Sequence, residues 1–537
     1  MGKLIRGGGS SDGRALLERI LHTPHLAHVV PRLRPEVLHK VIETCGLEDC
    51  GALVALTTPA QLQQVFDLDL WRPARPGLDE QFDPDRFAVW LEVLVESGAE
   101  VAAQKLAGVE ANLVIAALAQ HVRVMDVAAS SPYMTLDGEE VSASGQTPGA
   151  LVSEIGGYRI EGKRTAAWDA IIDLLLCLDQ GHPDYFHRVM GGCRRLSNSR
   201  PEIDGLDDLL SDDAQDMFDL TVDRESRRER QGYVTPAQAR AFLQAAREIQ
   251  IEIGAPPSVN PITRAYFRAI EPPAVDPQST SSSPGEDDKD EPDASSAVAE
   301  MVDVLREAGV LESQPRALLG GSHDEVSRLA RLEAQMRFAL DRDAAVYSAR
   351  SEELAYLANT IVAGCSIQAR PFSVQEASDA AAAICNLGLE NSPGCGEGFL
   401  LDHDLVSVFQ VGWRVLYTDV CMFAAEHLVG TLAGFRCHDR EIQSGLNALR
   451  ADLSRHWRAG TPWRARDAMD VIAILDLPAW AALLGLVDEC PVVHAALAAG
   501  RSKLRSIDPT AFEFISDNTQ IADVHAFMAA LPGTLRN

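Results

Sequence analysis

The fold is decided by residues 47–98, which read LEDCGALVALTTPAQLQQVFDLDLWRPARPGLDEQFDPDRFAVWLEVLVESG. This stretch contains three apolar patterns of helical length, separated by residues that start and stop helices. The last pattern forms one face of a 3.6-residue repeat, with apolar side chains at Phe87, Trp90, Leu91, Leu94 and Val95. Gly98 follows it as a helix stop. Each face is too narrow to be stable alone, so the stretch predicts helices stacked on helices.

The helix starts recur along the chain. The tetrapeptide Thr-Pro-Ala-Gln occurs at residues 58–61 and again at 235–238, and Thr461-Pro462 repeats its first half. A threonine hydroxyl caps the free amides of a first turn, and a proline at the first helical position has no amide to satisfy. Two interpretations stay open, a degenerate helical repeat or chance recurrence of favourable starts, because no fixed period of roughly 30–45 residues is present.

Two later segments have the same helical pattern and the same kind of stop. One apolar face consists of Phe242, Ala246, Ile249 and Ile253, followed by Gly254. The other consists of Val298, Met301, Val302, Leu305 and Ala308, followed by Gly309. The spacing predicts a helix in each segment that packs against a neighbour.

The composition agrees with a helical protein. Apolar residues make up 46% of the chain but aromatic residues only 6%. Small and straight-chain residues favour close helix packing, and runs of alternating β-branched residues are short and few. We therefore predict a predominantly all-α fold, with stacked helix pairs forming a superhelical N-terminal half and a second helical domain after an acidic linker.

The domain organisation is predicted from changes in composition. Residues 272–297, PPAVDPQSTSSSPGEDDKDEPDASSA, have almost no apolar side chains and a dense acidic run, which predicts a disordered linker. A weaker candidate for a domain boundary lies at residues 130–157, where the turn residues Asp137-Gly138 are compatible with a β-hairpin. The predicted parts are a disordered N-terminus at 1–13, an N-terminal helical domain at 14–271, the linker at 272–297 and a C-terminal helical domain at 298–537.

The charge balance bounds the choice of partners. The formal net charge is −30, with 78 acidic and 48 basic residues. Such a balance repels nucleic-acid phosphates and anionic lipid, so we expect neither nucleic acid nor a membrane as a partner. A high acidic charge also serves solubility. The sequence says nothing about the oligomeric state.

The cysteines indicate a reducing compartment. The ten cysteines include no pair at Cys-x-x-Cys spacing, and the start MGKLIRGGGSSDG has no apolar stretch. We expect reduced thiols, mostly buried, in a cytoplasmic protein, and no cofactor. The most apolar window, residues 405–435, is interrupted by charged side chains, which favours a core helix over a membrane span.

The first candidate site is a cluster of polar residues at 67–72. Asp67, Asp69, Trp71 and Arg72, with Asp79 and Glu80 further on, are groups that bind a cation or a polar ligand. An EF-hand loop is excluded because Leu68, Leu70 and Trp71 interrupt its ligand pattern. The alternative, which we favour, makes Phe66, Leu70 and Trp71 core residues. The aspartates then cap the next turn or pair with Arg72 and Arg75.

The second candidate site is a metal site in the C-terminal half. Metal-binding residue types gather near the most apolar window, at Cys421, His427, Cys437, His438 and Asp439. Cys421 and His427 are six residues apart, which places them on different faces of a helix. The remaining three residues reach them only if the chain turns at Gly434. We therefore do not favour a metal at this place.

Two further segments carry a functional and a structural interpretation. A glycine-rich loop at 394–398 contains Cys395, with His403 and Asp404 after it, and resembles a nucleophile or an anion nest. No Gly-Lys-Ser/Thr follows it, so a connecting loop is favoured. The acidic stretch at 202–223 has regularly spaced apolar residues. It predicts an amphipathic helix or helix pair with a solvated face, or else a docking surface for a basic partner.

Part of the chain resembles a known family. The pattern consists of QVFDLDLW at 64–71, followed by Asp85-Arg86-Phe87 with Trp90-Leu91, and then by HVRV at 121–124. It resembles a family of uncharacterised bacterial proteins known only as a domain of unknown function. The resemblance covers mainly residues 30–130, with weaker support at 232–236 and 512–521. It implies no activity, cofactor or catalytic residue, but it favours a cytoplasmic bacterial protein.

Two functional hypotheses follow. The first is a non-catalytic helical protein that binds or regulates a protein partner, as the stacked helices and the missing catalytic motifs indicate. The alternative is a helical enzyme or metalloprotein whose site uses cysteine, histidine and aspartate in the C-terminal half. Metal analysis of the purified protein and capture of one specific partner distinguish the two.

Overall fold

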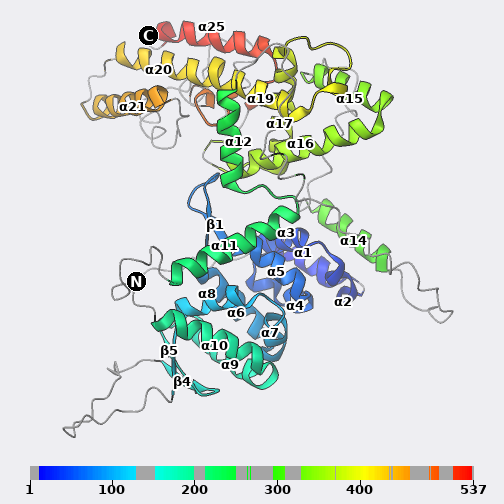
Figure 1. Cartoon of the computed structure of the whole chain (residues 1–537), viewed down its shortest axis with the longest axis vertical. Helices are drawn as coiled ribbons and strands as arrows, with labels where there is room; N and C mark the ends of the chain where they lie inside the picture. The colour runs from blue at the N-terminus through cyan, green and yellow to red at the C-terminus, as the bar shows by residue number, and fades with distance from the viewer. Residues whose placement is uncertain are drawn as a thin grey trace, which may run out of the picture. The chain divides into compact units, whose positions relative to one another are not determined.

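The computed structural model describes residues 11–23, 25–127, 151–198, 212–249, 263, 267, 294–308, 328–368, 370–434, 436, 440–459, 483, 485–494 and 512–534. These residues form a mostly helical protein with one three-stranded sheet and two two-stranded sheets (Figure 1). The predicted fold class is therefore confirmed. Within the described residues, none of the helices is both long and apolar enough to cross a membrane. Residues 405–434 of the apolar window lie in helices that contribute apolar side chains to the core, as expected.

The chain divides into two compact units, each assembled from three stretches of sequence. Unit 1 comprises residues 1–72, 81–227 and 275–313, and unit 2 comprises residues 73–80, 228–274 and 314–537. The sequence predicts a division at one linker, residues 272–297. The structure instead assigns α12 (Pro236–Glu248) to unit 2 and α14 (Ala294–Glu307) to unit 1. Residues 294–297 of the predicted linker are helical, and residues 272–293 lie outside the described part.

Unit 1 is built from short helices and one small sheet. Its helices besides α14 are α1 (Ser11–Leu21), α2 (Leu26–Val29), α3 (Pro35–Cys45), α4 (Gly51–Leu56), α5 (Pro59–Asp69), α6 (Pro84–Glu96), α7 (Ala99–Leu106), α8 (Ala111–His121), α9 (Trp168–Gly181), α10 (Pro183–Asn198) and most of α11 (Asp212–Arg230), with 3₁₀ turns η1 (Val30–Arg32) and η2 (Glu48–Cys50). Its core contains edge-to-face aromatic contacts of Phe66 with Phe87 and Trp90. The three helices predicted within residues 47–98 are α4, α5 and α6.

Strands interrupt the helices at two places in the first half of the chain. A two-stranded sheet pairs β1 (Trp71–Pro73) with β2 (Glu80–Phe82). A three-stranded sheet has the order β3 (Val122–Asp126), β5 (Tyr158–Gly162), β4 (Val152–Ile155). The β4–β5 hairpin turns at Gly156 and Gly157, which both have positive φ. The hairpin considered at Asp137-Gly138 lies outside the described residues.

Unit 2 contains longer helices. They are α12, α15 (Ala330–Arg342), α16 (Ala344–Gly364), α17 (Val374–Asn391), α18 (Phe399–Asp402), α19 (Leu405–Val415), a π-helix η4 (Leu416–Met422), α20 (Phe423–Gly434), α21 (Arg440–Ala459) and α25 (Asn518–Thr534), with strands β6 (Val492–His494) and β7 (Phe512–Phe514). The helices α19, η4 and α20 follow one another without a break. The core of unit 2 is formed mainly around α16, α17 and α19.

The repeated helix starts act as the sequence predicts. Thr58 caps α5 by accepting a hydrogen bond from the Gln61 amide, and Thr235 caps α12 in the same way through Gln238. In both, the glutamine side chain also accepts a hydrogen bond from the threonine amide, which completes a capping box. The repeated glutamine of the tetrapeptide therefore has a structural cause that the sequence analysis did not assign. Thr461-Pro462 lies outside the described residues.

Glycine allows a close helix contact in unit 2, between α17 and α19. A Cβ atom on Gly412 would lie 2.0 Å from the carbonyl oxygen of Ile384, and a Cβ on Gly388 would lie 2.0 Å from that of Val408. Only a residue without a side chain permits this approach. The two helices consequently pack backbone against backbone.

The predicted apolar faces are partly buried: Ile249 and Val302 are half-buried, and Ala308 is exposed. In α14, Met301 and Leu305 are 1% and 0% exposed and belong to the core of unit 1, against α1 and α2. In α12, Phe242 and Ala246 are buried in the core of unit 2. The helix α12 ends at Glu248, and Ile249, predicted to continue its apolar face, is instead an extended C-cap residue. Ile253 and the stops predicted at Gly254 and Gly309 lie outside the described residues.

Candidate functional site: a polar network at the end of α5

The polar network begins with two aspartates in the last turn of α5. Asp67 and Asp69 are two residues apart, so their side chains leave opposite sides of the helix. Both are buried, with 2% and 8% of their surface exposed. A buried carboxylate is stable only when it is paired and hydrogen-bonded. The two aspartates therefore need separate sets of partners.

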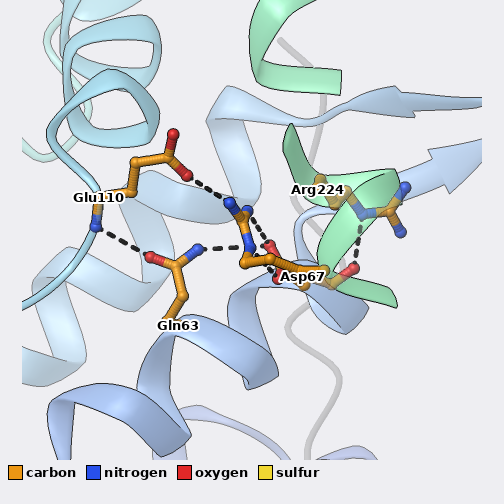
Figure 2. A network of polar contacts seen from close by, with 5 residues as sticks. Gln63, Asp67, Glu110 and Arg224 are labelled. Atoms are coloured by element: carbon orange, nitrogen blue, oxygen red, sulfur yellow. Dashed lines mark hydrogen bonds and ion pairs between the residues drawn. The ribbon is translucent and has the colours of Figure 1, made fainter. Parts of the chain in front are cut away.

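Asp67 is held by two arginines of α11. Arg227 donates two hydrogen bonds to the Asp67 carboxylate, from Nε to Oδ2 and from Nη2 to Oδ1, each 2.8 Å long. Arg224 donates from Nε to the Asp67 carbonyl oxygen at 2.8 Å (Figure 2). The two-bond contact matches the planar guanidinium to the planar carboxylate. Together these bonds fix α11 to the end of α5, and we call them the arginine clamp.

Glu110 and Gln63 extend the clamp. Arg227 Nη1 donates to Glu110 Oε2 at 2.6 Å. Gln63 lies between the two acids, as Figure 2 shows: its Nε2 donates to Asp67 Oδ1 at 3.3 Å, and its Oε1 accepts from the Glu110 amide at 2.9 Å. Burial alone would lower the pKa of Arg227, but hydrogen bonds and charge attraction from Asp67 and Glu110 raise it above its ordinary value. The guanidinium therefore stays charged.

The pKa of Glu110 reflects its buried position beside Arg227. Burial raises its pKa above the ordinary value, and the charges of Asp223 and Asp67 act in the same direction. The attraction of Arg227 opposes this rise without cancelling it.

Trp71 is a core residue that supports the clamp. Its side chain is 4% exposed, and the Arg224 guanidinium carbon lies 4.5 Å from its ring centroid. Phe82 of β2 packs on the same indole, with ring centroids 5.5 Å apart. Stacking of a guanidinium on an indole adds a favourable electrostatic contact to the packing. The expectation that Trp71 belongs to the core is met.

Asp69 has its own partners on the other side of α5. Its Oδ2 accepts hydrogen bonds from Arg86 Nε at 2.7 Å and from Trp90 Nε1 at 2.5 Å. His39 Nε2 lies 3.4 Å from Oδ1. Burial alone would raise the pKa of Asp69, but the hydrogen bonds from His39, Arg86 and Trp90, with the Arg86 charge, hold the pKa well below its ordinary value. The carboxylate joins α3, α5 and α6.

This depressed pKa predicts a pH-dependent contribution to stability. Because the folded-state pKa of Asp69 lies below its unfolded value, its contribution is complete above about pH 4 and is lost as the pH falls toward the folded-state pKa. Asp69→Asn should therefore reduce the free energy of unfolding by about 2 kcal/mol at neutral pH. The difference from the unmodified protein should shrink as the pH falls below 4. Urea denaturation at a series of pH values measures it.

A matched control for this prediction is Asp85→Asn. Asp85 forms an exposed ion pair with Arg164, and its side chain is 70% exposed. Its replacement should change stability by less than about 1 kcal/mol at every pH. A stability difference for Asp69→Asn that stays constant between pH 7 and pH 2 would contradict the assignment of the pH effect to this carboxylate.

The structure separates the members of the predicted cluster. Asp67 and Trp71 come together through Arg224, whereas Asp69 belongs to the second network. Arg72 is well exposed and contacts Asp83, with 3.7 Å between Nε and Oδ2. The expected pairing of the aspartates with Arg72 does not occur, because both carboxylates point into the core and find partners there.

Asp79 and Glu80 are also paired. Within unit 2, Asp79 Oδ1 accepts from Arg240 Nη2 at 2.8 Å, and Glu80 Oε2 accepts from Arg228 Nη1 at 2.7 Å. The carboxylates of residues 67–80 thus each have an arginine partner from elsewhere in the chain.

Sequence reasoning missed the arginines that define the network. Arg224 and Arg227 are 157 and 160 residues away from Asp67. One signal was present: Leu220, Arg224 and Arg227 are four and three residues apart, a spacing that places them on one face of a helix. Arginines on the apolar side of a helix indicate buried acidic partners, because an unpaired guanidinium is costly to bury.

The second candidate site is only partly described. Cys421 is buried, its thiol lies 3.7 Å from the Val487 carbonyl oxygen, and burial raises its pKa to about 12. The His427 ring packs on Phe423, with centroids 4.1 Å apart. Cys437, His438 and Asp439 lie outside the described residues. Over the part of the chain that is described, three or more metal-binding side chains do not gather anywhere.

The glycine-rich loop leads into α18. Gly394 and Gly398 both have positive φ, as a connecting loop requires. Burial raises the pKa of the Cys395 thiol, against the opposing effect of Arg331. His403 stacks on Phe399, with ring centroids 4.0 Å apart. A raised thiol pKa gives little nucleophilic thiolate at neutral pH.

One family model matches the first part of the chain. Residues 9–201 match the model of a family described as a family of unknown function, DUF6178. The resemblance to a domain of unknown function is thereby confirmed, and the match extends beyond residues 30–130 on both sides. Asp67, Asp69 and Glu110 lie inside the matched region, whereas Arg224 and Arg227 follow it. Neither a curated protein nor a solved structure matches the chain.

Proposed function

We propose that this chain is a cytoplasmic bacterial protein that binds another protein and performs no catalysis. The observation that carries the proposal is the arrangement of α11, which is fixed to unit 1 on one side and presents large apolar side chains on the other. The nine described cysteines are free thiols, which supports a reducing compartment. The match to a family of unknown function is compatible with such a role.

The inner side of α11 is held rigidly. Leu220 and Arg224 are 1% and 3% exposed, and Arg227 completes the clamp on Asp67. Buried apolar contact and charge-assisted hydrogen bonds therefore fix the helix at several points along its length. A surface that is already ordered loses little conformational entropy when a partner binds.

The outer side of α11 carries the apolar side chains. Phe218 is 59% exposed and Val222 is 41% exposed, and they lie four residues apart on one helix face. Single exposed apolar residues are ordinary on protein surfaces. Two adjacent ones on an anchored helix form a contact area that a partner can cover, and burial of apolar surface is the main driving force of association.

Partner capture with matched variants tests the proposal. The full chain, the double variant Phe218→Ser/Val222→Ser and the control variant Val374→Ser are immobilised and exposed to lysate of the source cells. Val374 is 60% exposed on α17 in unit 2, so the control removes a similar apolar group elsewhere. We expect one protein to be retained by the full chain and by the control but not by the double variant. Native circular dichroism of all three proteins excludes misfolding.

Two results would contradict the proposal. One is a set of retained proteins that is the same for all three baits. The other is stoichiometric zinc or iron in the purified protein that is lost on replacement of Cys437 and His438, which would favour the metalloprotein alternative.

A further inference from the structure

We infer that the outer face of α11 binds a basic amphipathic helix of the partner protein. The outer face is defined by the exposed residues Gln215, Phe218, Asp219, Val222, Asp223 and Ser226. The inference rests on the proposed function and names the chemistry of the partner.

The outer face is continuous along the helix. Its members recur at intervals of three and four residues, so they form one stripe of a 3.6-residue repeat. Phe218 and Val222 make an apolar row, and Asp219 and Asp223 make an acidic row beside it. In each row the residues are one helical turn apart, a spacing of about 6 Å. A partner helix reproduces this spacing with its own residues i and i+4.

The hydrogen bonds of the arginine clamp described above go to acceptors other than Asp219 and Asp223. Arg224 and Arg227 point to the inner side, where they bind Asp67 and Glu110. Gln215 donates to Asp219 Oδ1 at 2.9 Å, a hydrogen bond whose donor is uncharged. Like charges four residues apart on a helix destabilise it. A cationic side chain placed between Asp219 and Asp223 relieves this repulsion.

The surrounding charge also favours a basic partner. Asp223 contributes to the raised pKa of Glu110, so its negative charge extends into the clamp. The whole chain carries a net charge of −30. Long-range attraction of this kind speeds encounter with a positively charged partner and orients it. The apolar row then supplies the contact that persists at higher salt.

Peptide titration tests the inference. The probe is a fluorescein-labelled helix-forming peptide of about 16 residues, with leucines at i and i+4 and lysines and arginines on both sides of them. A second peptide has the same composition in scrambled order. The full chain is titrated into each peptide, and fluorescence anisotropy reports binding at low and high salt.

Four variants locate the binding surface. We expect Phe218→Ser/Val222→Ser to weaken binding at least about tenfold, since apolar anchors dominate interface energies. Asp219→Asn/Asp223→Asn should weaken binding by about three- to tenfold and flatten its salt dependence, because it removes rim charges. Val374→Ser and Glu92→Gln, which change an exposed apolar residue and an exposed acid elsewhere, should bind as the unmodified chain does.

Each contrary result has a distinct meaning. Equal binding of the scrambled peptide, or undiminished binding to Phe218→Ser/Val222→Ser, would overturn the inference in favour of unspecific charge attraction. Failure of the unmodified chain to bind the peptide, while a captured protein still depends on Phe218, would refute the basic helix and leave the proposed function standing. Self-association in sedimentation velocity that is abolished by Phe218→Ser/Val222→Ser would assign the outer face to a second copy of the chain.

Discussion

Replacing Arg227 by methionine is expected to lower the free energy of unfolding by about 3–5 kcal/mol. The substitution keeps most of the apolar stem but removes the charge that compensates Asp67, whose side chain is only 3% exposed. An uncompensated carboxylate then remains buried between α5 and α11. Urea denaturation followed by circular dichroism measures the effect. Arg227→Lys keeps the charge but loses the two-bond geometry. Its free energy of unfolding should lie between those of the unmodified protein and Arg227→Met.

The matched control is Arg72→Met. Its side chain is 61% exposed and its Nε lies 3.7 Å from Asp83, so its loss should cost less than about 1 kcal/mol. In a double-mutant cycle, Asp67→Asn should recover part of the stability lost in Arg227→Met, since no unpaired charge remains. Independent, additive effects of the two substitutions would show that Asp67 and Arg227 are not coupled.

The second large effect is expected at the crossing of α17 and α19. Gly412→Ala would place a Cβ atom 2.0 Å from the Ile384 carbonyl oxygen and 2.9 Å from the Gly388 nitrogen. No side chain can move to make room, because the obstructing atoms belong to the backbone of α17. The helices must separate, and we expect a loss of about 3 kcal/mol. Faster hydrogen exchange of the amides in α17 and α19 should accompany it.

Gly430→Ala is the control for this prediction. Gly430 lies inside α20, and a Cβ atom there would meet nothing within 4 Å. Alanine is the better helix former by about 0.8–1.0 kcal/mol, so this variant should be as stable as the unmodified protein or more stable. If both glycine variants were stabilised, the close approach of α17 and α19 would be refuted.

The helices of this protein could be predicted from its sequence because their signals are local. The spacing of Phe87, Trp90 and Leu91 depends only on the 3.6-residue repeat, and α6 buries these three residues as expected. The Thr-Pro starts are equally local, because a cap and its amides lie within one turn. Signals of this kind involve only a few neighbouring residues, so they can be recognised without knowledge of the tertiary fold.

The polar network could not be predicted in the same way. Asp67 and Arg227 meet only because α11 packs against α5, and nothing local to either residue records that contact. The short strands were missed for a related reason: β3 alternates the buried Val122 and Val124 with the exposed Arg123, but three such residues are a weak signal beside a long helix. Arginines on the buried side of α11 were the available evidence for long-range ion pairs.

The order of the sequence has a consequence for synthesis on the ribosome. Unit 1 needs α14, yet α12, which belongs to unit 2, is translated before it. Nascent domains ordinarily complete themselves in order from the N-terminus. Here the first unit must wait for Met301 and Leu305 to emerge before α1 and α2 are covered. During that interval a growing chain that ends shortly after α12 exposes an apolar patch to chaperones.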